Sequence, residues 1–298
     1  MKRSLSDTRG SRGGFLFFLL FLRVFGTKHA RIMVRIVSFF YALFDRRARE
    51  KAAPYLRHRF PQDRGLRRFR HVWLLFARQG EALLALEAVR LGKMKVVFHD
   101  ASESVREARQ PDGGFVLLNS HFGPWQATLQ AASFTGSVFN IFMLNDLNRQ
   151  VDKLSILRDD PAMKGKVRII APETSWGGLI EAREALERGE IVTMMGDRSM
   201  EANPLRVPFL GEEADFPVAG FHLAAKSHKP VVCIFAHESD TDPDTVILDF
   251  AGAVFPEMKG RDRAELLPYL KEYVSLLETF SRKYPYNCFM FENIWEKP

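Results

Sequence analysis

The chain of 298 residues is 46% hydrophobic and 27% charged, a balance typical of a folded protein, and its 12% aromatic content excludes a mainly disordered chain. A mean hydropathy of −0.15 and the absence of a charge-free apolar run of membrane-spanning length exclude a polytopic membrane protein. Because Cys233 and Cys288 are the only cysteines, no disulfide framework is expected, and two reduced thiols fit a cytosol-facing protein.

Positive charge is concentrated in the first third of the chain. The net charge is +7, but residues 1–100 hold 22 Lys and Arg against 7 Asp and Glu, whereas residues 101–298 hold 21 against 29. A basic segment that also contains apolar runs indicates an anionic partner, which can be a membrane surface, a nucleic acid or an acidic protein.

Two apolar segments with basic flanks, FLFFLLFL at 15–22 and RIMVRIVSFFYALF at 31–44, open the chain. A helix over 14–26 would be about 20 Å long, short of the roughly 30 Å hydrocarbon core of a bilayer. Arg31 and Arg35 are four residues apart and share one face of a helix. We therefore predict that residues 1–45 form basic amphipathic helices in the membrane interface. There are two alternatives. The segments can pack on a soluble domain as ordinary amphipathic helices, or they can form a single tilted span with snorkelling arginines.

The next segment, 46–71, is rich in arginine and is interrupted by Pro54 and Pro61. A long helix is predicted over 66–91, ended by Gly92. Short apolar runs then alternate with helical segments. The predicted strands are 95–98, 114–118, 137–144, 167–171, 190–195, 230–236 and 245–250, and the predicted helices are 101–109, 124–134, 148–157, 175–188, 217–228 and 262–283.

Apolar strands that alternate with helices are typical of an α/β fold. We predict a mostly parallel central sheet of about seven strands wrapped by helices, in one domain over 46–298. The turn at 239–245 is expected to join the last two strands as a hairpin, so that one edge is antiparallel. The segment from Pro204 to the helix at Pro217 carries few helix or strand signals and is expected to be a loop that covers an apolar pocket.

The first candidate site follows the strand at 114–118, in the sequence NSHFGPWQ at 119–126. The strand ends near His121, and Pro124 suits the first turn of a new helix. Gln126 lies within reach of the imidazole. An imidazole with an orienting hydrogen-bond partner is what a general base requires, although a capping or structural histidine is the alternative.

The second candidate site follows the strand at 190–195, where Gly196 leads into Asp197 and Arg198. In a parallel sheet this strand end and His121 lie on the same rim, where ligands bind. The planar guanidinium of Arg198 can hold a phosphate or carboxylate, and Asp197 can fix Arg198 or a loop backbone. A surface ion pair is the alternative.

No metal site is predicted. The acidic residues of the 239–245 turn resemble the start of a calcium loop, but Thr245 and Ala251 stand where that loop needs Gly and Glu. No His or Cys cluster has zinc spacing, and nucleotide-binding motifs are absent. A nucleic-acid partner is not expected either, because only the arginines favour it and no recognition module accompanies them.

The block NSHFGPWQ resembles the His-x4-Asp/Glu motif of the lysophospholipid acyltransferase superfamily, and more narrowly that of the lipid A biosynthesis late acyltransferases, the lauroyl and myristoyl transferases. MMGDRSM, the segment RVPFLGEEADFPVAGFHLAAKSHKPVVCIFAH and the ending YPYNCFMFENIW resemble later blocks of that family. The resemblance covers nearly the whole chain, including its basic, apolar start.

This resemblance implies a membrane-associated acyltransferase at the cytoplasmic face of the inner membrane. It would move a fatty acyl group from a thioester on acyl carrier protein or coenzyme A to a hydroxyl or amine of a lipid or glycolipid, without a metal or redox cofactor. His121 would be the general base, oriented by Gln126, while the backbone N–H groups at 122–124 and Arg198 would stabilise the oxyanion. The residues expected to bind substrate are Phe122, Gly123, Trp125, Asp197 and Arg198.

The chain departs from the family motif at Gln126, where the family has Asp or Glu. An amide oxygen can orient an imidazole, but it lacks the charge that stabilises the imidazolium formed during catalysis. Two hypotheses follow. Another carboxylate, such as Glu173 or Asp197, supplies the charge, or the chain is a non-catalytic relative that binds acylated lipids or an acyl carrier.

Overall fold

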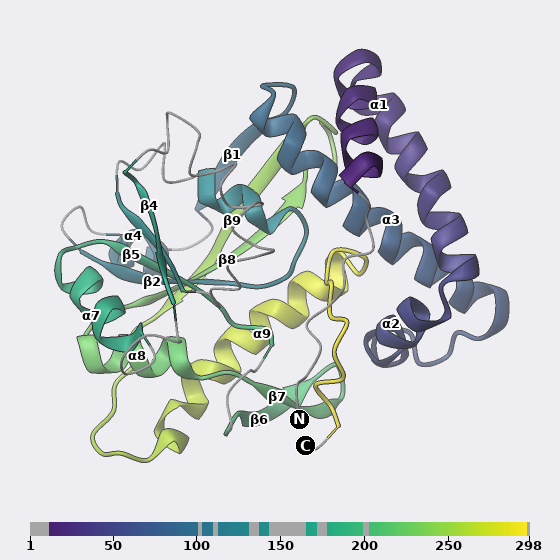
Figure 1. Cartoon of the computed structure of the whole chain (residues 1–298). Helices are drawn as coiled ribbons and strands as arrows, with labels where there is room; N and C mark the ends of the chain where they lie inside the picture. Colours follow the sequence, from purple (N-terminus) through teal and green to yellow (C-terminus); the bar gives the residue numbers. More distant parts are fainter. Residues whose placement is uncertain are drawn as a thin grey trace.

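The computed structural model describes residues 12–100, 103–109, 113–130, 137–142, 165–171, 178–198 and 203–296. In this part of the chain a seven-stranded sheet lies between two layers of helices, and the N-terminal helices pack at one end of the sheet (Figure 1). The predicted α/β fold with a mostly parallel sheet is confirmed.

The strand order of the sheet is β1-β9-β8-β2-β5-β3-β4. From β8 to β4 neighbouring strands run parallel, whereas β9 is antiparallel to β8 and pairs in parallel with β1 at the edge. The predicted hairpin is thus confirmed. The strands are β1 (Lys95–Asp100), β2 (Phe115–Asn119), β3 (Phe139–Phe142), β4 (Val167–Ile170), β5 (Ile191–Met195), β8 (Val231–Glu238) and β9 (Thr245–Val254).

Helices cover both faces because the central strands are apolar on both. In β2, Val116 and Leu118 belong to one core cluster and Phe115 and Leu117 to the other, as the alternation of side chains along a strand requires. The first cluster is formed with α7 (Leu179–Glu187), α8 (Ala219–Ser227) and α9 (Leu267–Lys283). The second is formed with α4 (Glu103–Ala108), part of α1 (Arg12–Phe44) and the end of α3 (Gly65–Arg90).

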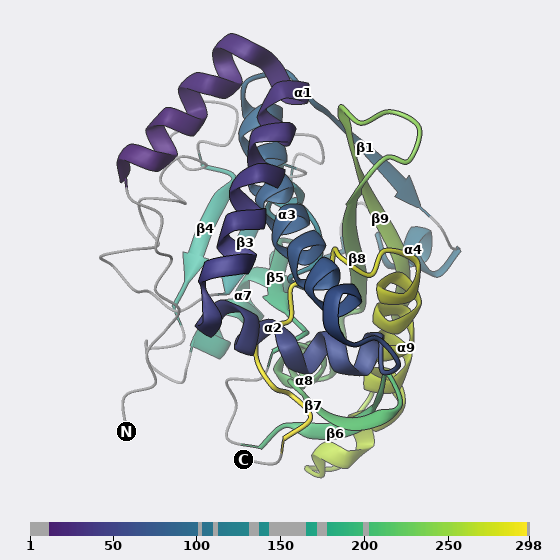
Figure 2. The same ribbon diagram turned by 90° about the vertical axis from the view of Figure 1, so that its right-hand side faces the viewer.

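The two N-terminal apolar segments form α1, which is bent at Gly26, where φ is 75° and ψ is 179°. Its second half runs alongside α3 (Figure 2), and the two helices approach closely at Gly80, where an added Cβ would lie 2.6 Å from Val34 Cγ1. In the described ranges no helix is long and apolar enough to cross a membrane.

The arginines at 31 and 35 of α1 face carboxylates of the protein, whereas an interfacial helix would turn them toward an anionic membrane surface. Arg35 Nε lies 2.6 Å from Glu81 Oε1 of α3, and Arg31 pairs with Glu238 and Asp244 at 3.7 and 3.6 Å. Arg31 and Arg35 are therefore directed toward carboxylates of the protein, although Arg35 remains 54% exposed. Arg23 and Lys28 of the same helix are exposed, as is much of its apolar face. Arg31 and Arg35 contribute positive charge beside the largely buried Glu81 and Glu238 and the half-exposed Asp244.

Residues 46–59 form a continuous helix, α2 (Arg46–Arg59), so the interruption expected at Pro54 was wrong. Asp45 caps its start by accepting a hydrogen bond from the N–H of Ala48 at 2.9 Å. A proline inside a helix removes one backbone hydrogen bond, and here the burial of Tyr55 and Leu56 beside it offsets that loss.

The segment expected to be a loop before the Pro217 helix is a β-hairpin, with β6 (Leu205–Phe209) antiparallel to β7 (Glu212–Phe216). Its turn places Leu210 at φ 53° and Gly211 at φ 93°. The hairpin was missed because leucine is not a usual residue for a turn with positive φ, and because Pro208 argues against a strand except at a sheet edge.

The remaining helices differ from expectation mainly in their ends. Of the predicted 124–134 helix only 124–130 is described, and 125–130 of it is the 3₁₀ helix η1 (Trp125–Gln130). The predicted helix at 262–283 divides into the 3₁₀ turn η3 (Arg263–Leu266) and α9. The predicted helix at 148–157 lies outside the described residues.

Candidate active site

The two candidate segments leave neighbouring strands at the same rim of the sheet. β2 and β5 pair in parallel with Asn119 opposite Met195, and the N–H of Gly196 donates to Asn119 O at 2.7 Å. His121 and Asp197 each follow their strand by two residues. The rim predicted from the sequence therefore brings these two side chains together.

His121 forms a hydrogen bond with Asp197. Its Nδ1 lies 3.1 Å from Oδ1 and 3.0 Å from Oδ2 of the carboxylate. The Asp197 side chain is 2% exposed, whereas that of His121 is 25% exposed. A buried carboxylate thus holds one ring nitrogen, while the ring remains accessible from outside.

Electrostatics keeps this carboxylate ionised. Burial acts to raise the pKa of Asp197, but the charge and hydrogen bond of His121 and the charge of Arg198 together outweigh it and hold the pKa below its usual range. An ionised carboxylate can only accept, so Nδ1 carries a proton, and in the neutral form of the imidazole this is the only ring proton. Nε2 then carries the lone pair, which is the tautomer that a general base needs.

Gln126 lies in η1 and is half-buried. Among the residues that the structure describes, no hydrogen bond joins it to His121. Its neighbour Trp125 contacts the imidazole instead, with ring centroids 5.4 Å apart at 66°. Of the two carboxylates considered in place of Gln126, Asp197 is the one that contacts the imidazole, whereas Glu173 lies outside the described residues.

The loop after His121 is fixed by packing. Phe122 is fully buried, and its ring contacts those of Phe235 and Phe280 at 5.6 and 6.1 Å. Gly123 has a φ of 54°, and an added Cβ there would lie 2.0 Å from Ala236 O, so only glycine fits.

The backbone N–H groups of this loop are engaged inside the protein. That of Phe122 donates to Ser120 O and that of Gly123 to Asn287 O, both at 2.7 Å, while Pro124 has none. They are thus not free to bind an oxyanion in this arrangement, in contrast to the expectation from the sequence. Arg198 is the positively charged side chain that lies beside His121.

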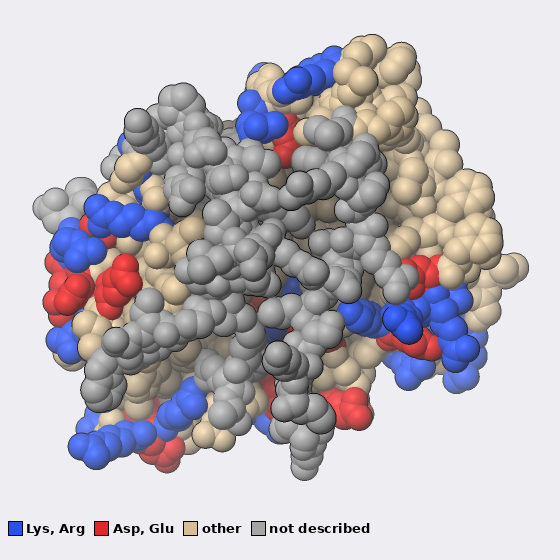
Figure 3. Space-filling model, in the orientation of Figure 1, with Lys and Arg blue, Asp and Glu red and all other residues tan. Residues whose placement is uncertain are grey.

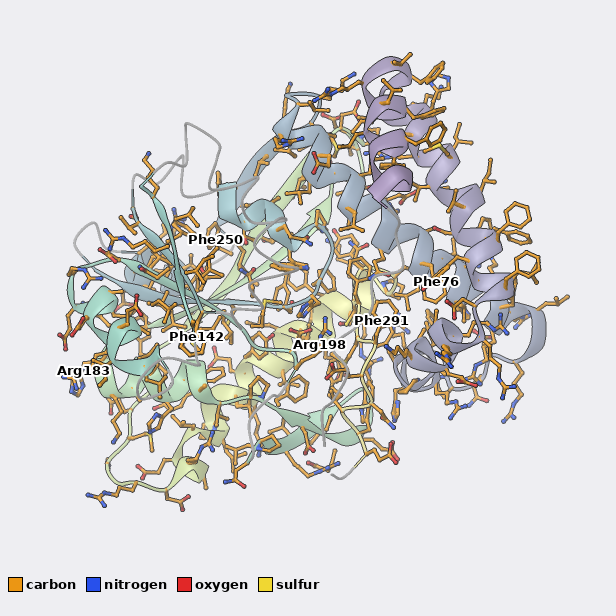
Figure 4. The ribbon with its side chains drawn as sticks, in the orientation of Figure 1. Phe76, Phe142, Arg183, Arg198, Phe250 and Phe291 are labelled. Carbon is orange, nitrogen blue, oxygen red and sulfur yellow. The ribbon has the colours of Figure 1, made fainter. Side chains whose placement is uncertain are left out.

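Arg198 lies beside the His121–Asp197 pair, in the centre of Figure 4, on the side of the C-terminal segment that carries Phe291. Its Nε is 3.2 Å from His121 Nδ1 and 3.9 Å from Asp197 Oδ2, and its Nη1 is 3.8 Å from Glu292 Oε1. Because Nδ1 donates to the carboxylate, Arg198 contributes positive charge rather than a hydrogen bond to the ring.

Tyr273 lies near the site but was not identified from the sequence. Tyr273 is buried on α9, and an added Cβ at Gly196 would lie 2.8 Å from its hydroxyl oxygen. Burial, followed by the negative charge of Asp197, raises the pKa of Tyr273 well above its usual range, so the hydroxyl stays protonated near the carboxylate. In the sequence it looks like any apolar position of an amphipathic helix, and only the tertiary structure brings it to the site.

The fold and site define an α/β protein with a histidine–carboxylate pair at the carboxyl rim of its sheet, an arrangement suited to activating a hydroxyl or amine nucleophile. The family model described as bacterial lipid A biosynthesis acyltransferase matches residues 15–297. The chain therefore belongs to this family, as the resemblance indicated. No curated protein matches it.

Proposed function

We propose that this protein transfers a fatty acyl group from a thioester, on acyl carrier protein or coenzyme A, to a hydroxyl or amine of a lipid or glycolipid at the cytoplasmic face of the inner membrane. Membership of the family supports an acyltransferase that acts on lipid. The observation that carries the proposal is the contact of His121 Nδ1 with the buried Asp197 carboxylate at 3.0 Å.

The proposed reaction begins when Nε2 of His121 takes the proton of the acceptor hydroxyl or amine, whose oxygen or nitrogen attacks the thioester carbonyl. Asp197 stabilises the imidazolium that forms, and Arg198 stabilises the negative charge on the carbonyl oxygen. Collapse of the tetrahedral intermediate expels the thiolate, which recovers the proton from His121. The products are an acylated lipid and a free thiol, and the steps require neither a metal nor a redox group.

The exposed apolar face of α1 supports a membrane location. Figure 3 shows a broad tan surface over α1, with Lys and Arg gathered over α2. An apolar patch of this kind on a soluble chain marks a membrane or protein contact. The exposed apolar residues of α1 are Phe17, Leu20, Val24, Phe25, Ile32, Ile36, Val37, Phe39, Phe40, Tyr41, Leu43 and Phe44.

The second candidate is a non-catalytic protein that binds acylated lipids or an acyl carrier, and the substitution at Gln126 favours it. The experiment incubates the purified protein with labelled acyl carrier protein or labelled acyl coenzyme A and a membrane lipid extract, with His121→Ala as the control. Label in a lipid with the wild-type protein but not with the variant supports transfer. Binding of the donor without any labelled lipid supports the second candidate.

A further inference from the structure

A chain of alternating charges links α1 to the end of β8, behind the loop that carries His121. Arg78 Nη1 lies 2.9 Å from both Glu81 Oε2 and Glu238 Oε2, so one side chain bridges α3 to the end of β8. Arg35 binds Glu81 from α1, and Arg31 binds Glu238. With Asp244, which also pairs with Arg31, the chain contains three cations and three anions.

These ion pairs are not ordinary surface contacts. The side chains of Glu81, Glu238 and Arg31 are 1%, 15% and 12% exposed. Those of Arg78, Asp244 and Arg35, in contrast, are 40%, 48% and 54% exposed, so the buried carboxylates are held by arginines that reach toward the surface. Burial raises the pKa of Glu238, and Glu81 adds to this effect, while Arg31 and Arg78 oppose it. Removing one partner from such a network leaves a buried charge unpaired, so the geometry of the network is tightly constrained.

The end of β8 lies directly behind the loop after His121. Gly123 packs so closely on the carbonyl of Ala236 that no Cβ fits between them. Arg78 and Glu238 also line a cavity of about 10 Å³ together with Gly123 and Pro124. A cavity of that size has room for one water molecule and not for a substrate group. Arg78 therefore lies beside the loop, at a space too small for a ligand.

The same network fixes the inner face of α1, whose outer face is the exposed apolar surface. Two described charged residues of α1 are connected to the end of β8. Arg31 pairs with Glu238 directly, and Arg35 is connected to it through Glu81 and Arg78. Arg31 lies 3.7 Å from Glu238, whereas every contact of the route from Arg35 through Glu81 and Arg78 is between 2.6 and 2.9 Å. The route through Arg78 is therefore the tighter connection between α1 and Glu238.

We propose that Arg78 is a positioning residue that couples the seating of α1 on an apolar surface to the loop that holds His121. This inference rests on the proposed function, since it takes the apolar surface to be a lipid bilayer. Contact of α1 with the bilayer then sets the position of the imidazole, and the active site is completed only when the protein is on the membrane.

The experiment measures the rate at which diethyl pyrocarbonate modifies His121 in the full-length protein, with and without vesicles of phosphatidylethanolamine and phosphatidylglycerol. His99, which is 64% exposed on β1, serves as the reference within each sample. Flotation with the same vesicles is measured in parallel. The variants are Arg78→Met, Arg78→Lys, Glu238→Gln and the control Arg183→Met. Arg183 lies in an exposed pair with Glu187 on α7, far from Arg198 in Figure 4.

Vesicles are expected to change the rate at His121, relative to His99, by about threefold or more in the wild-type protein and in Arg183→Met, since a shift of about 1 Å alters reactivity strongly. Arg78→Met is expected to float like the wild type but to lose this change. Arg78→Lys should recover it, because an ammonium group can donate to both glutamates. If Arg78→Met does not fold, Glu238→Gln takes its place with the same expected loss.

The proposal is overturned if His121 in Arg78→Met or Glu238→Gln still responds to vesicles like the wild type, since the bilayer would then act on the site directly. It is also overturned if the wild type floats without any response, or if loss of response always accompanies loss of flotation. Failure of the wild type to float overturns the membrane part of the proposed function, and flotation detects this independently of His121.

Kinetics provide a second readout. With acceptor presented in vesicles, Arg78→Met should lower kcat by about tenfold or more, because loss of positioning at a reacting centre has effects of this size. The KM for the acyl donor should change little, and Arg78→Lys should restore kcat. An effect on KM alone would contradict a positioning role.

Discussion

At the scale of single residues, the central question is what supplies negative charge to His121 in a chain that carries Gln126. A motif within one loop can be read from the sequence, but the Asp197 carboxylate comes from a different strand, 76 residues away. Parallel pairing of β2 and β5 brings the two together. An amide at Gln126 is thus compatible with the proposed catalysis, because the Asp197 carboxylate places a negative charge next to Nδ1 of His121.

We expect Asp197→Asn to lower kcat by about 10³-fold to 10⁴-fold, because an amide can donate to Nδ1 and so favours the wrong tautomer of His121. Steady-state transfer to the lipid acceptor measures this. Gln126→Ala is the matched control and should retain most activity. A large loss in Gln126→Ala, with near-normal activity in Asp197→Asn, would show that Gln126 orients the ring after all.

The pKa of Asp197, held below its usual range, also predicts how stability depends on pH. A carboxyl group with a depressed pKa in the folded state contributes stability above its unfolded pKa of about 3.9, and this contribution is lost as the pH falls through the folded-state value. The difference in unfolding free energy between the wild type and Asp197→Asn should therefore shrink below about pH 4. Urea unfolding from pH 7 to pH 3 checks this, and a constant difference would contradict it.

At the scale of secondary-structure elements, the sheet was predictable and some of its surroundings were not. Strands such as β2 and β5 are short apolar runs with both faces buried, so composition alone identifies them. The hairpin of β6 and β7 was hidden by Pro208 and Leu210, and α2 continues through Pro54 because tertiary burial outweighs local propensity. Likewise, the strand pattern predicts that His121 lies at the rim of the sheet, whereas the position of Tyr273 near Asp197 depends on how α9 packs.

The orientation of α1 predicts that its binding to a membrane depends mainly on apolar side chains and less on its arginines. Since Arg31 and Arg35 bind carboxylates of the protein, the exposed apolar side chains are expected to dominate binding. Replacing both Ile36 and Phe40 with Asp should weaken partitioning into vesicles by about tenfold or more, because each apolar side chain contributes about 1.5–3 kcal/mol when buried. Flotation measures the effect.

The matched control for this prediction is Leu66→Asp, which changes an 87% exposed leucine at the start of α3, outside α1. It should bind vesicles like the wild type. Thermal unfolding of all variants should stay within a few degrees, because the substituted side chains are exposed. Equal partitioning of the α1 variant and the control would remove α1 as the membrane contact.

At the scale of the whole molecule, the excess of positive charge in residues 1–100 is divided between two surfaces. Part of it neutralises acidic groups inside the protein, as at Arg31 and Arg35, and part remains exposed around α2 and the start of α3 (Figure 3). Arg59 donates to Ser281 O and Arg282 O at 3.2 and 2.9 Å and is therefore occupied. The exposed arginines of this region are Arg46, Arg47, Arg57, Arg64, Arg67 and Arg70, and the last four form a cluster between the end of α2 and the start of α3.

The arginines of this surface lie close enough together to repel one another. Burial, followed by repulsion from Arg57 and Arg64, lowers the pKa of Arg68. Arginines that repel one another without enough acidic neighbours form a surface to which an acidic protein is attracted over a distance. The cluster accordingly fits the docking of an acidic acyl carrier protein, and lipid headgroups are its alternative ligand.

We expect the triple variant Arg64→Glu, Arg67→Glu and Arg70→Glu to raise the KM for an acyl carrier protein donor by about tenfold, because charge reversal slows electrostatically steered association. Use of acyl coenzyme A should suffer less, since that donor offers a smaller anionic surface. The wild-type rate with the carrier should fall as ionic strength rises. Charge reversal at Arg106 and Arg183, away from the cluster, is the control and should leave both donors unaffected. If the triple variant instead loses flotation with anionic vesicles and keeps normal kinetics on a detergent-solubilised acceptor, the cluster binds headgroups; normal behaviour in both assays would exclude both ligands.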